Sequence, residues 1–327
     1  MELQHSNGAK LNTLSDIVPL RMPLSLSIGL TNTCNLKCNY CYHGSEKKRE
    51  DIKQGIYKPH TLTEEEIDLI VDQTKKFGGK YKQVTLVGNG EPLLAKTLLY
   101  AIRRLKEVSE KIKITTNATL LTDELSLNMI EAGVDLIKIS FQGMKDEKYK
   151  KICGADVSVE QLIERIRFLY DHRKQASIHL KVADMALDEG EEIEFKKAFK
   201  DITDAAWIER ISPVDNAGKW VGDVNRWGND ERIKVCFFPF YYIYINERLD
   251  VIPCCGGEFV IGNLRNKDIK SLWDDEIRLL CIRQLEEKAY LYPKCLNCHV
   301  MQAMYRPENN LDSKKEEILN RYNKEIL

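Results

Sequence analysis

The sequence has no long hydrophobic run and no excess of positive charge. Its first apolar stretch, residues 17–30, is interrupted by Pro19, Arg21 and Pro23, and no run approaches the ~18 apolar residues of a membrane span. The 49 Lys and Arg residues face 50 Asp and Glu residues, so no basic surplus favours DNA, RNA or an anionic membrane as a partner. These absences predict a soluble, cytoplasmic protein that acts on a small substrate or a neutral partner.

Repeats and low-complexity tracts are also absent, whereas cysteine is plentiful. Ten cysteines would suit a secreted disulfide scaffold only in a short chain with an export signal, and this chain of 327 residues has neither property. In a reducing compartment, clustered thiols more often bind metal. The length allows one large domain and a smaller one.

Short apolar and β-branched runs alternate with helical patterns through the first two thirds of the chain. The predicted strands are residues 24–30, 83–87, 111–116, 135–141, 177–183 and 206–211. The predicted helices are residues 63–76, 94–111, 122–132, 157–173 and 190–201. This alternation predicts βαβ units, an α/β fold with a parallel sheet, and functional residues at the carboxyl ends of the strands.

The pattern changes after Pro213. Residues 214–235 are rich in Gly, Asn and Asp and indicate a linker or lid between a barrel domain, residues 24–213, and a smaller domain, residues 236–311. Within the smaller domain, residues 240–245 and 249–252 predict a β-hairpin, and residues 267–287 predict a helix. Residues 1–23 are predicted to form an extended or partly ordered lead-in, and residues 312–327 a solvated amphipathic helix.

Three cysteines follow the first predicted strand. Cys34, Cys38 and Cys41 have CxxxCxxC spacing on a loop short enough for their thiolates to converge. Iron-sulfur clusters are normally held by four thiolates, so a set of three leaves one iron open to a substrate that can accept an electron. The alternatives are chance clustering or a zinc loop, for which His43 would have to be the fourth ligand.

This spacing, with Tyr40 before the last cysteine, resembles the signature of the radical S-adenosylmethionine (SAM) superfamily. The resemblance implies a partial (β/α)6 TIM-like barrel, in which the open iron of a [4Fe-4S] cluster chelates SAM and Tyr40 lies beside its adenine. Residues 88–92 resemble the family's GGE motif, although Asn89 departs from it. By this resemblance Gly90 and Glu91 meet the SAM ammonium, and the alternative is an ordinary strand-to-helix turn.

Further positions are assigned to SAM by the same resemblance. Gly88 begins the GGE-like segment, and Asn117, Ser140 and Gln142 at the next two strand ends would contact the SAM ribose or carboxylate. Small polar side chains that cap turns are the alternative interpretation.

A second group of cysteines lies in the last third of the chain. Together with Gly262-Asn263-Leu264 and Ser271-Leu272-Trp273, it resembles the SPASM/twitch auxiliary-cluster domain. Four thiolates suffice for one [4Fe-4S] cluster, and a four-thiolate zinc site is the alternative. No cysteine lies in residues 299–305, which favours the single-cluster twitch type. The predicted ligands are Cys236, Cys254, Cys295 and Cys298, with Cys255 as an alternate to Cys254.

The resemblance implies that an electron from flavodoxin or ferredoxin drives cleavage of SAM to a 5'-deoxyadenosyl radical, which abstracts a substrate hydrogen. Twitch relatives oxidise alcohols of sugars or aminocyclitols, whereas other members epimerise or cross-link ribosomally made peptides. About 23 residues precede the first strand, fewer than a leader-recognition domain needs, which favours a small polar substrate over a peptide. Too few cysteines are present for the two auxiliary clusters of sulfatase maturation.

We expect a radical SAM oxidoreductase of the dehydrogenase type rather than the epimerase type. Epimerisation needs a thiol that faces the substrate radical. Cys153 and Cys281 are instead predicted to be buried small apolar residues, and Cys255 is a possible cluster ligand. A non-catalytic Fe-S or zinc protein is the alternative of another class, against which the Gly90-Glu91 pair argues.

Overall fold

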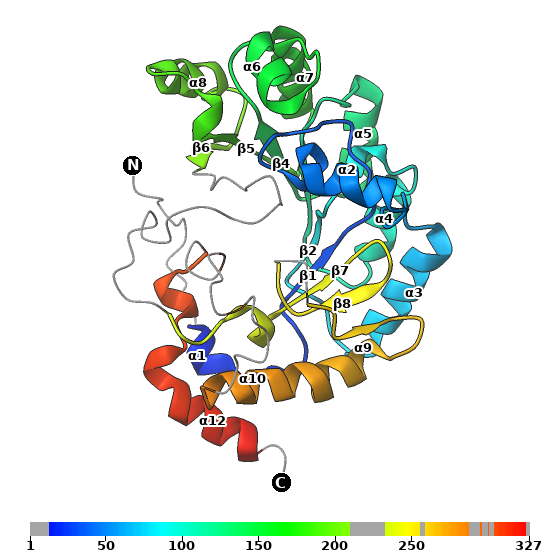
Figure 1. Ribbon diagram of the computed structural model, residues 1–327, viewed down its shortest axis with the longest axis vertical. Coiled ribbons are helices and arrows are strands. Elements are labelled where there is room, and N and C mark those ends of the chain that lie inside the picture. The colour runs from blue at the N-terminus through cyan, green and yellow to red at the C-terminus, as the bar shows by residue number, and fades with distance from the viewer. Residues whose placement is uncertain are drawn as a thin grey trace.

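The computed structural model describes residues 13–209, 233–255, 259–287, 295, 300 and 304–324, and one curved sheet organises them (Figure 1). Its strand order in this part of the chain is β6-β5-β4-β3-β2-β1-β7-β8-β9. The strands are β1 (Ser25–Ile28), β2 (Gln83–Leu86), β3 (Ile112–Thr116), β4 (Leu136–Phe141), β5 (Ser177–Ala183), β6 (Ala205–Glu209), β7 (Tyr242–Ile245), β8 (Asp250–Ile252) and β9 (Gly262–Asn263).

Strands β1 to β6 are parallel, and each pairs with the next along the chain. The predicted fold class, a partial barrel of six βα units followed by a hairpin, is therefore confirmed. The hairpin of β7 and β8 does not stand apart from the barrel. Strand β7 pairs in parallel with β1, so the smaller C-terminal region extends the barrel sheet at its first strand.

Helices cover the outer face of this sheet (Figure 1). All five predicted helices are present, and the expected capping box joins Thr63 and Glu66. Two further helices were not predicted, because α2 and α6 are short and strongly charged. The helices around the barrel are α2 (Glu46–Lys53), α3 (Glu64–Lys75), α4 (Leu98–Leu105), α5 (Asp123–Ala132), α6 (Asp146–Cys153), α7 (Val159–Asp171) and α8 (Glu191–Phe199).

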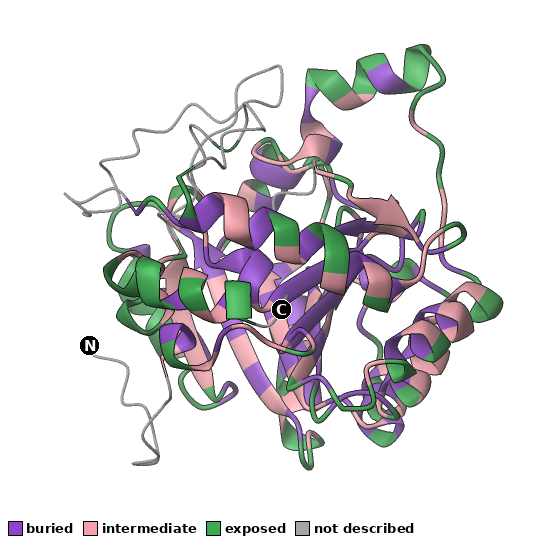
Figure 2. Cartoon of the chain, turned by 90° about the horizontal axis from the view of Figure 1, so that it is seen from below, coloured by how far each residue is buried: buried purple, intermediate pink, exposed green. Residues whose placement is uncertain are grey.

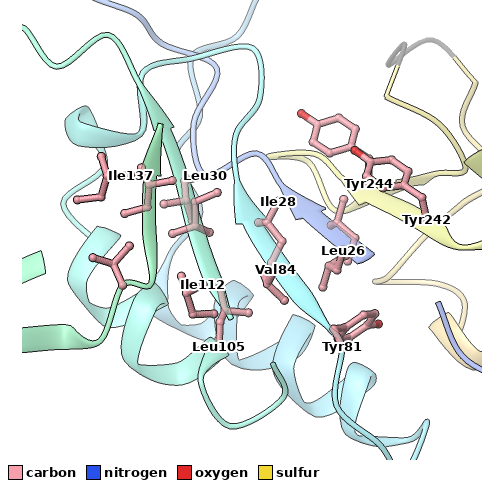
Figure 3. Close-up of a cluster of buried hydrophobic side chains, with 14 of the residues drawn as sticks. Leu26, Ile28, Leu30, Tyr81, Val84, Leu105, Ile112, Ile137, Tyr242 and Tyr244 are labelled. Carbon is pink, nitrogen blue, oxygen red and sulfur yellow. The ribbon is translucent and has the colours of Figure 1, made fainter. Parts of the chain in front are cut away.

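The core lies between the strands and this helical layer. Along β3 and β4, fully buried isoleucines alternate with partly exposed residues. Figure 2 shows buried and intermediate positions alternating along strands of the sheet. Successive side chains of a strand point to opposite faces. Figure 3 shows Val84, Ile112 and Ile137 from the sheet gathered with Leu105 of α4. The alternate positions therefore face the concave side of the barrel.

The predicted helix 267–287 is present as three continuous pieces, with a π-helical turn in the middle. They are α9 (Ile269–Ser271), the π-helical η6 (Leu272–Ile277) and α10 (Arg278–Leu285). No helix among the described residues is long and apolar enough to cross a membrane.

The last helix, α12 (Lys315–Lys324), is not simply solvated, which corrects the sequence-based expectation. Its Ile318 and Tyr322 are buried, and the helix packs against α10. Arg321 donates a hydrogen bond to the carbonyl oxygen of Asp16 at 3.1 Å, which ties α12 to α1 (Leu14–Ile17) in the lead-in. The high charge of this segment hid two apolar positions, four residues apart, that share one helix face.

We predict that Ile318→Ala lowers the free energy of unfolding by about 2–5 kcal/mol, because it removes a fully buried side chain. The exposed Asn320 on the same helix gives the matched control Asn320→Ala, which should change it by less than about 0.5 kcal/mol. Denaturant titration of the purified protein measures both. Equal effects of the two substitutions would show that α12 is not docked.

Candidate functional site

The loop of three cysteines runs from the end of β1 to α2, and α6 holds its backbone. The amide of Lys37 donates to the carbonyl of Cys153 at 2.8 Å, and the amide of Asn39 donates to that of Ile152 at 2.9 Å. The thiols of Cys34, Cys38 and Cys41 are partly exposed and lie close enough for the charge of one to influence the pKa of another. The loop therefore carries three neighbouring thiols, and their shared binding of one cluster stays a prediction.

The thiol of Cys153 adds a sulfur to this loop. Cys153 is fully buried at the end of α6, as expected, but its Sγ lies 3.5 Å from Sγ of Cys38. The hydrogen bond between Cys38 and Cys153 lowers the pKa of Cys38, whereas burial raises that of Cys34 to about 11. Cys38 is thus the thiol of the three that the protein most favours as a thiolate, which is the form that binds iron.

His43 does not complete a zinc site in this geometry. Its Nε2 donates to the carbonyl oxygen of Asn89, and its Nδ1 accepts from the ammonium of Lys48 at 2.5 Å. Burial lowers the pKa of His43, so the neutral ring with a proton on Nε2 satisfies both partners. The ring joins the cysteine loop to the GGE-like segment, a role that the sequence did not reveal.

The spacing of the thiols also differs from that of a single-ion site. Among the described residues, no three His, Cys, Asp or Glu side chains lie close enough together to share one metal ion. Zinc needs each sulfur at ~2.3 Å from the same ion. In a [4Fe-4S] cluster each thiolate binds a different iron, so the three thiols need not share one ion.

Glu91 is buried beneath the cysteine loop, with 3% of its surface exposed. Its carboxylate accepts hydrogen bonds from Thr116 Oγ1 at 2.5 Å, the amide of Asn117 at 2.8 Å and the amide of Leu93 at 3.1 Å. Burial raises the pKa of Glu91, although these three hydrogen bonds act to lower it. The carboxylate thus joins the ends of β2 and β3. The predicted contact with the SAM ammonium stays a prediction, for which about one acceptor position remains.

The backbone of the GGE-like segment also contacts the cysteine loop. The amide of Glu91 donates to the carbonyl oxygen of Thr33 at 2.8 Å. A Cβ atom at Gly90 would collide with the carbonyl oxygens of Thr31 and Thr33, and one at Gly88 would meet Gly29. Both glycines are required here by close backbone approach.

Polar side chains at the ends of β3 and β4 complete the contacts with the loop. Asn117 donates to Asn35 at 3.0 Å, and Asn35 donates to Thr119 at 2.8 Å. The hydroxyl of Tyr40 donates to the side-chain oxygen of Gln142. The amide nitrogen of the Gln142 side chain in turn donates to the carbonyl of Ser140 at 3.2 Å, so Tyr40, Ser140 and Gln142 lie together. The ends of four consecutive strands thus converge on the cysteines.

The second group of cysteines flanks the hairpin, with Cys236 before its first strand and the others after its second. The amide of Cys236 donates to Gln284 of α10 at 2.8 Å, and Cys254 and Cys255 follow β8. Burial raises the pKa of Tyr241, and the charges of Cys255 and Cys236 raise it further, which places both thiols near the same ring. The structure leaves the choice between Cys254 and Cys255 open.

The remaining predicted ligands are only partly described. Cys295 is exposed, and Cys298 lies outside the described residues, as does most of the predicted linker 214–235. Cys281 is buried in α10, as expected, and burial raises its pKa to about 12.

The chain combines a partial parallel barrel, three cysteines after its first strand and a neighbouring hairpin that bears further cysteines. This combination defines a class of cluster-dependent radical enzymes. The chain belongs to the radical SAM superfamily, which its residues 28–199 match, and residues 236–299 match the SPASM iron-sulfur cluster-binding domain. Its cofactors are accordingly the [4Fe-4S] cluster of that superfamily, SAM, and an auxiliary Fe-S cluster.

Known proteins resemble separate aspects of the chain. A probable GTP 3',8-cyclase of Pyrococcus abyssi is 36% identical over 142 residues, which are 43% of this chain and 42% of that protein. The chain therefore spans less than half the length of this curated relative. The structure of BtrN in complex with AdoMet and 2-DOIA has a TM-score of 0.52 at 15% identity, covering 82% of this chain and 89% of BtrN. SuiB of Streptococcus suis bound to precursor peptide SuiA has a TM-score of 0.60 at 17% identity, covering 87% and 71%.

We predict that Gly90→Ala lowers the iron content of the first cluster and weakens SAM binding, because the new methyl group displaces the loop that carries Cys34. Gly55→Ala is the control, since a Cβ there meets no atom within 4 Å and only its positive φ of 69° is strained. Iron analysis and SAM titration after anaerobic reconstitution compare the two. If both variants match the wild type, the close contact between the two loops is not needed.

Proposed function

We propose that the protein oxidises a small polar substrate, converting an alcohol to a carbonyl, as a radical SAM dehydrogenase. The observation that carries this proposal is the position of the thiols. An epimerase needs a thiol that can give a hydrogen atom to the substrate radical. Among the described residues, no cysteine lies on the strands that face the barrel interior. The thiol of Cys153 is hydrogen-bonded to that of Cys38, and Cys281 is buried in α10.

The site residues have the following roles in this proposal. Cys34, Cys38 and Cys41 bind the first cluster, and Tyr40 lies beside the SAM adenine. The segment of Gly88, Gly90 and Glu91 receives the SAM ammonium, while Asn117, Ser140 and Gln142 contact its ribose or carboxylate. Their convergence at adjacent strand ends supports these assignments. The auxiliary ligands are Cys236, Cys254 or Cys255, Cys295 and Cys298.

When bound, the first cluster and SAM supply a 5'-deoxyadenosyl radical, and the auxiliary cluster can accept one electron. The substrate loses a hydrogen atom, then a proton and an electron, so one alcohol carbon becomes a carbonyl. The chain itself must hold one C–H bond against the radical and exclude other hydrogen donors. Flavodoxin or ferredoxin is the proposed electron donor.

Peptide maturation is the second candidate, because the fold of SuiB, solved with a precursor peptide, covers 87% of this chain. A likeness at 17% identity shows a shared fold alone. The product of the reaction must therefore decide between oxidation of a small substrate and peptide maturation.

We predict about eight iron and eight sulfide per chain after anaerobic reconstitution, from two four-iron clusters. Replacement of Cys34, Cys38 and Cys41 together with alanine should leave about four of each. Metal and sulfide analysis measures both proteins. Zinc in place of the remaining iron, or no remaining metal, would show that the second thiol set is misassigned.

We predict that a substrate, once found, loses about 2 mass units when the reaction runs in D2O, because oxidation to a carbonyl removes two hydrogens. Mass spectrometry of the product makes the measurement. A product with an unchanged skeleton and one solvent deuterium, abolished by Cys255→Ala, Cys281→Ala or Cys153→Ala, would establish epimerisation and refute the dehydrogenase.

A further inference from the structure

Three lysines lie on the concave face of consecutive strands. Lys113 is on β3, Lys138 on β4 and Lys181 on β5, and each occupies a partly exposed position between fully buried apolar residues. In the parallel register Lys138 pairs with Thr115, two residues beyond Lys113, and Lys181 pairs with Ser140, two residues beyond Lys138. The three lysines therefore form a diagonal row that rises toward the strand ends.

The described residues do not balance the charge of this row. Lys181 forms an ion pair with Glu209 of β6 at 2.5 Å. Lys113 donates instead to the neutral side chain of Gln83, and the ammonium of Lys138 lies 5.8 Å from the ring of Trp207. Among the described residues, neither Lys113 nor Lys138 has a carboxylate partner within ion-pair distance, so three ammonium groups face one carboxylate and two positive charges remain.

This excess is costly to the fold. Burial lowers the pKa of Lys138, and the neighbouring Lys181 lowers it further, whereas the charge of Glu209 raises it by a smaller amount. Burial and Lys138 both lower the pKa of Lys113. Partly buried charges in proteins are normally paired. His179, which pairs with Lys138 in register and lies 6.1 Å from Trp207, is likewise disfavoured as a cation by burial. The apolar core does not need this row of lysines. The row therefore indicates a ligand that supplies the missing negative charge.

We propose that this lysine row binds a phosphate monoester, the anionic group of a small substrate, with Lys113 and Lys138 as its main contacts. A phosphate monoester carries a charge of about −1.5 to −2 at neutral pH, which matches the two uncompensated charges better than a single carboxylate does. Lysine binds phosphate as a point charge and needs no bidentate geometry. This inference rests on the proposed function, since it takes the substrate to occupy the barrel interior.

The position of the row also orients the substrate. Lys181 lies beside Ser140, whose carbonyl accepts from Gln142 in the predicted SAM site, and Lys113 lies near the start of β3. A phosphate held by Lys113 and Lys138 would leave the rest of the substrate to extend toward the cysteine loop. The same charges disfavour a cationic aminocyclitol, which narrows the substrates expected from the sequence to phosphorylated polyols or sugars.

Calorimetric unfolding of the reconstituted holoenzyme, with inorganic phosphate as the probe, tests the proposal. Phosphate binding to the folded state should raise the wild-type Tm by about 2 °C or more over chloride at equal ionic strength. Acetate serves as the monovalent carboxylate and should give a smaller shift. Lys138→Met should lose the phosphate-specific shift, and its Tm without phosphate should equal or exceed that of the wild type, because an unpaired charge is removed.

Lys197→Met is the matched control, because Lys197 is exposed on α8, outside the barrel interior, and should behave as the wild type. Retention of the full phosphate shift in Lys138→Met, or its absence from the wild type, would overturn the proposal. A lower Tm of Lys138→Met without phosphate would show that Lys138 already has a stabilising partner, which also refutes it. The readout needs no radical chemistry. A phosphate shift in a protein that fails to cleave SAM would refute the proposed function alone.

Discussion

The buried carboxylate of Glu91 connects the segments on which the site depends. It accepts hydrogen bonds from the end of β3 and from its own turn, while its amide holds the cysteine loop at Thr33. A buried carboxylate is tolerated only when its hydrogen bonds are satisfied, so these segments must keep one arrangement. His43 makes a second connection between the same two loops. The result is a hydrogen-bonded support for the loop of three thiols.

The two faces of the sheet have different roles. The outer face packs the core, and the concave face carries the polar groups of the proposed site. The outer face carries the buried isoleucines and the helices, and it accounts for the apolar core. The concave face carries Lys113, Lys138 and Lys181. These lysines contribute little to that core, and their positive charges repel one another. Strand β7 brings the second thiol set to the edge of the same sheet through its pairing with β1. One continuous sheet thus supports the SAM loop, the proposed substrate anchor and the auxiliary site.

Periodicity and motif spacing predicted much of this arrangement, because both depend on local order in the chain. The six parallel strands, the hairpin and the cysteine loop follow from patterns that are contiguous in sequence. Contacts between distant segments could not be predicted in this way. The bond from Cys153 to Cys38 spans 115 positions, and Cys153 looked like any buried cysteine. The buried face of α12 was missed because charged residues dominate its composition, and the net charge of −1 concealed the local lysine row.

The central claim is that the cysteine loop, supported by Glu91 and His43, holds a cluster that cleaves SAM. The most direct test is the release of 5'-deoxyadenosine from SAM by the reconstituted, chemically reduced protein under anaerobic conditions. We predict that the wild type releases it, and that a variant with Cys34, Cys38 and Cys41 changed to alanine does not, although its auxiliary iron remains. A wild-type protein that carries both clusters and releases no 5'-deoxyadenosine, or a triple variant that releases as much, would contradict the account.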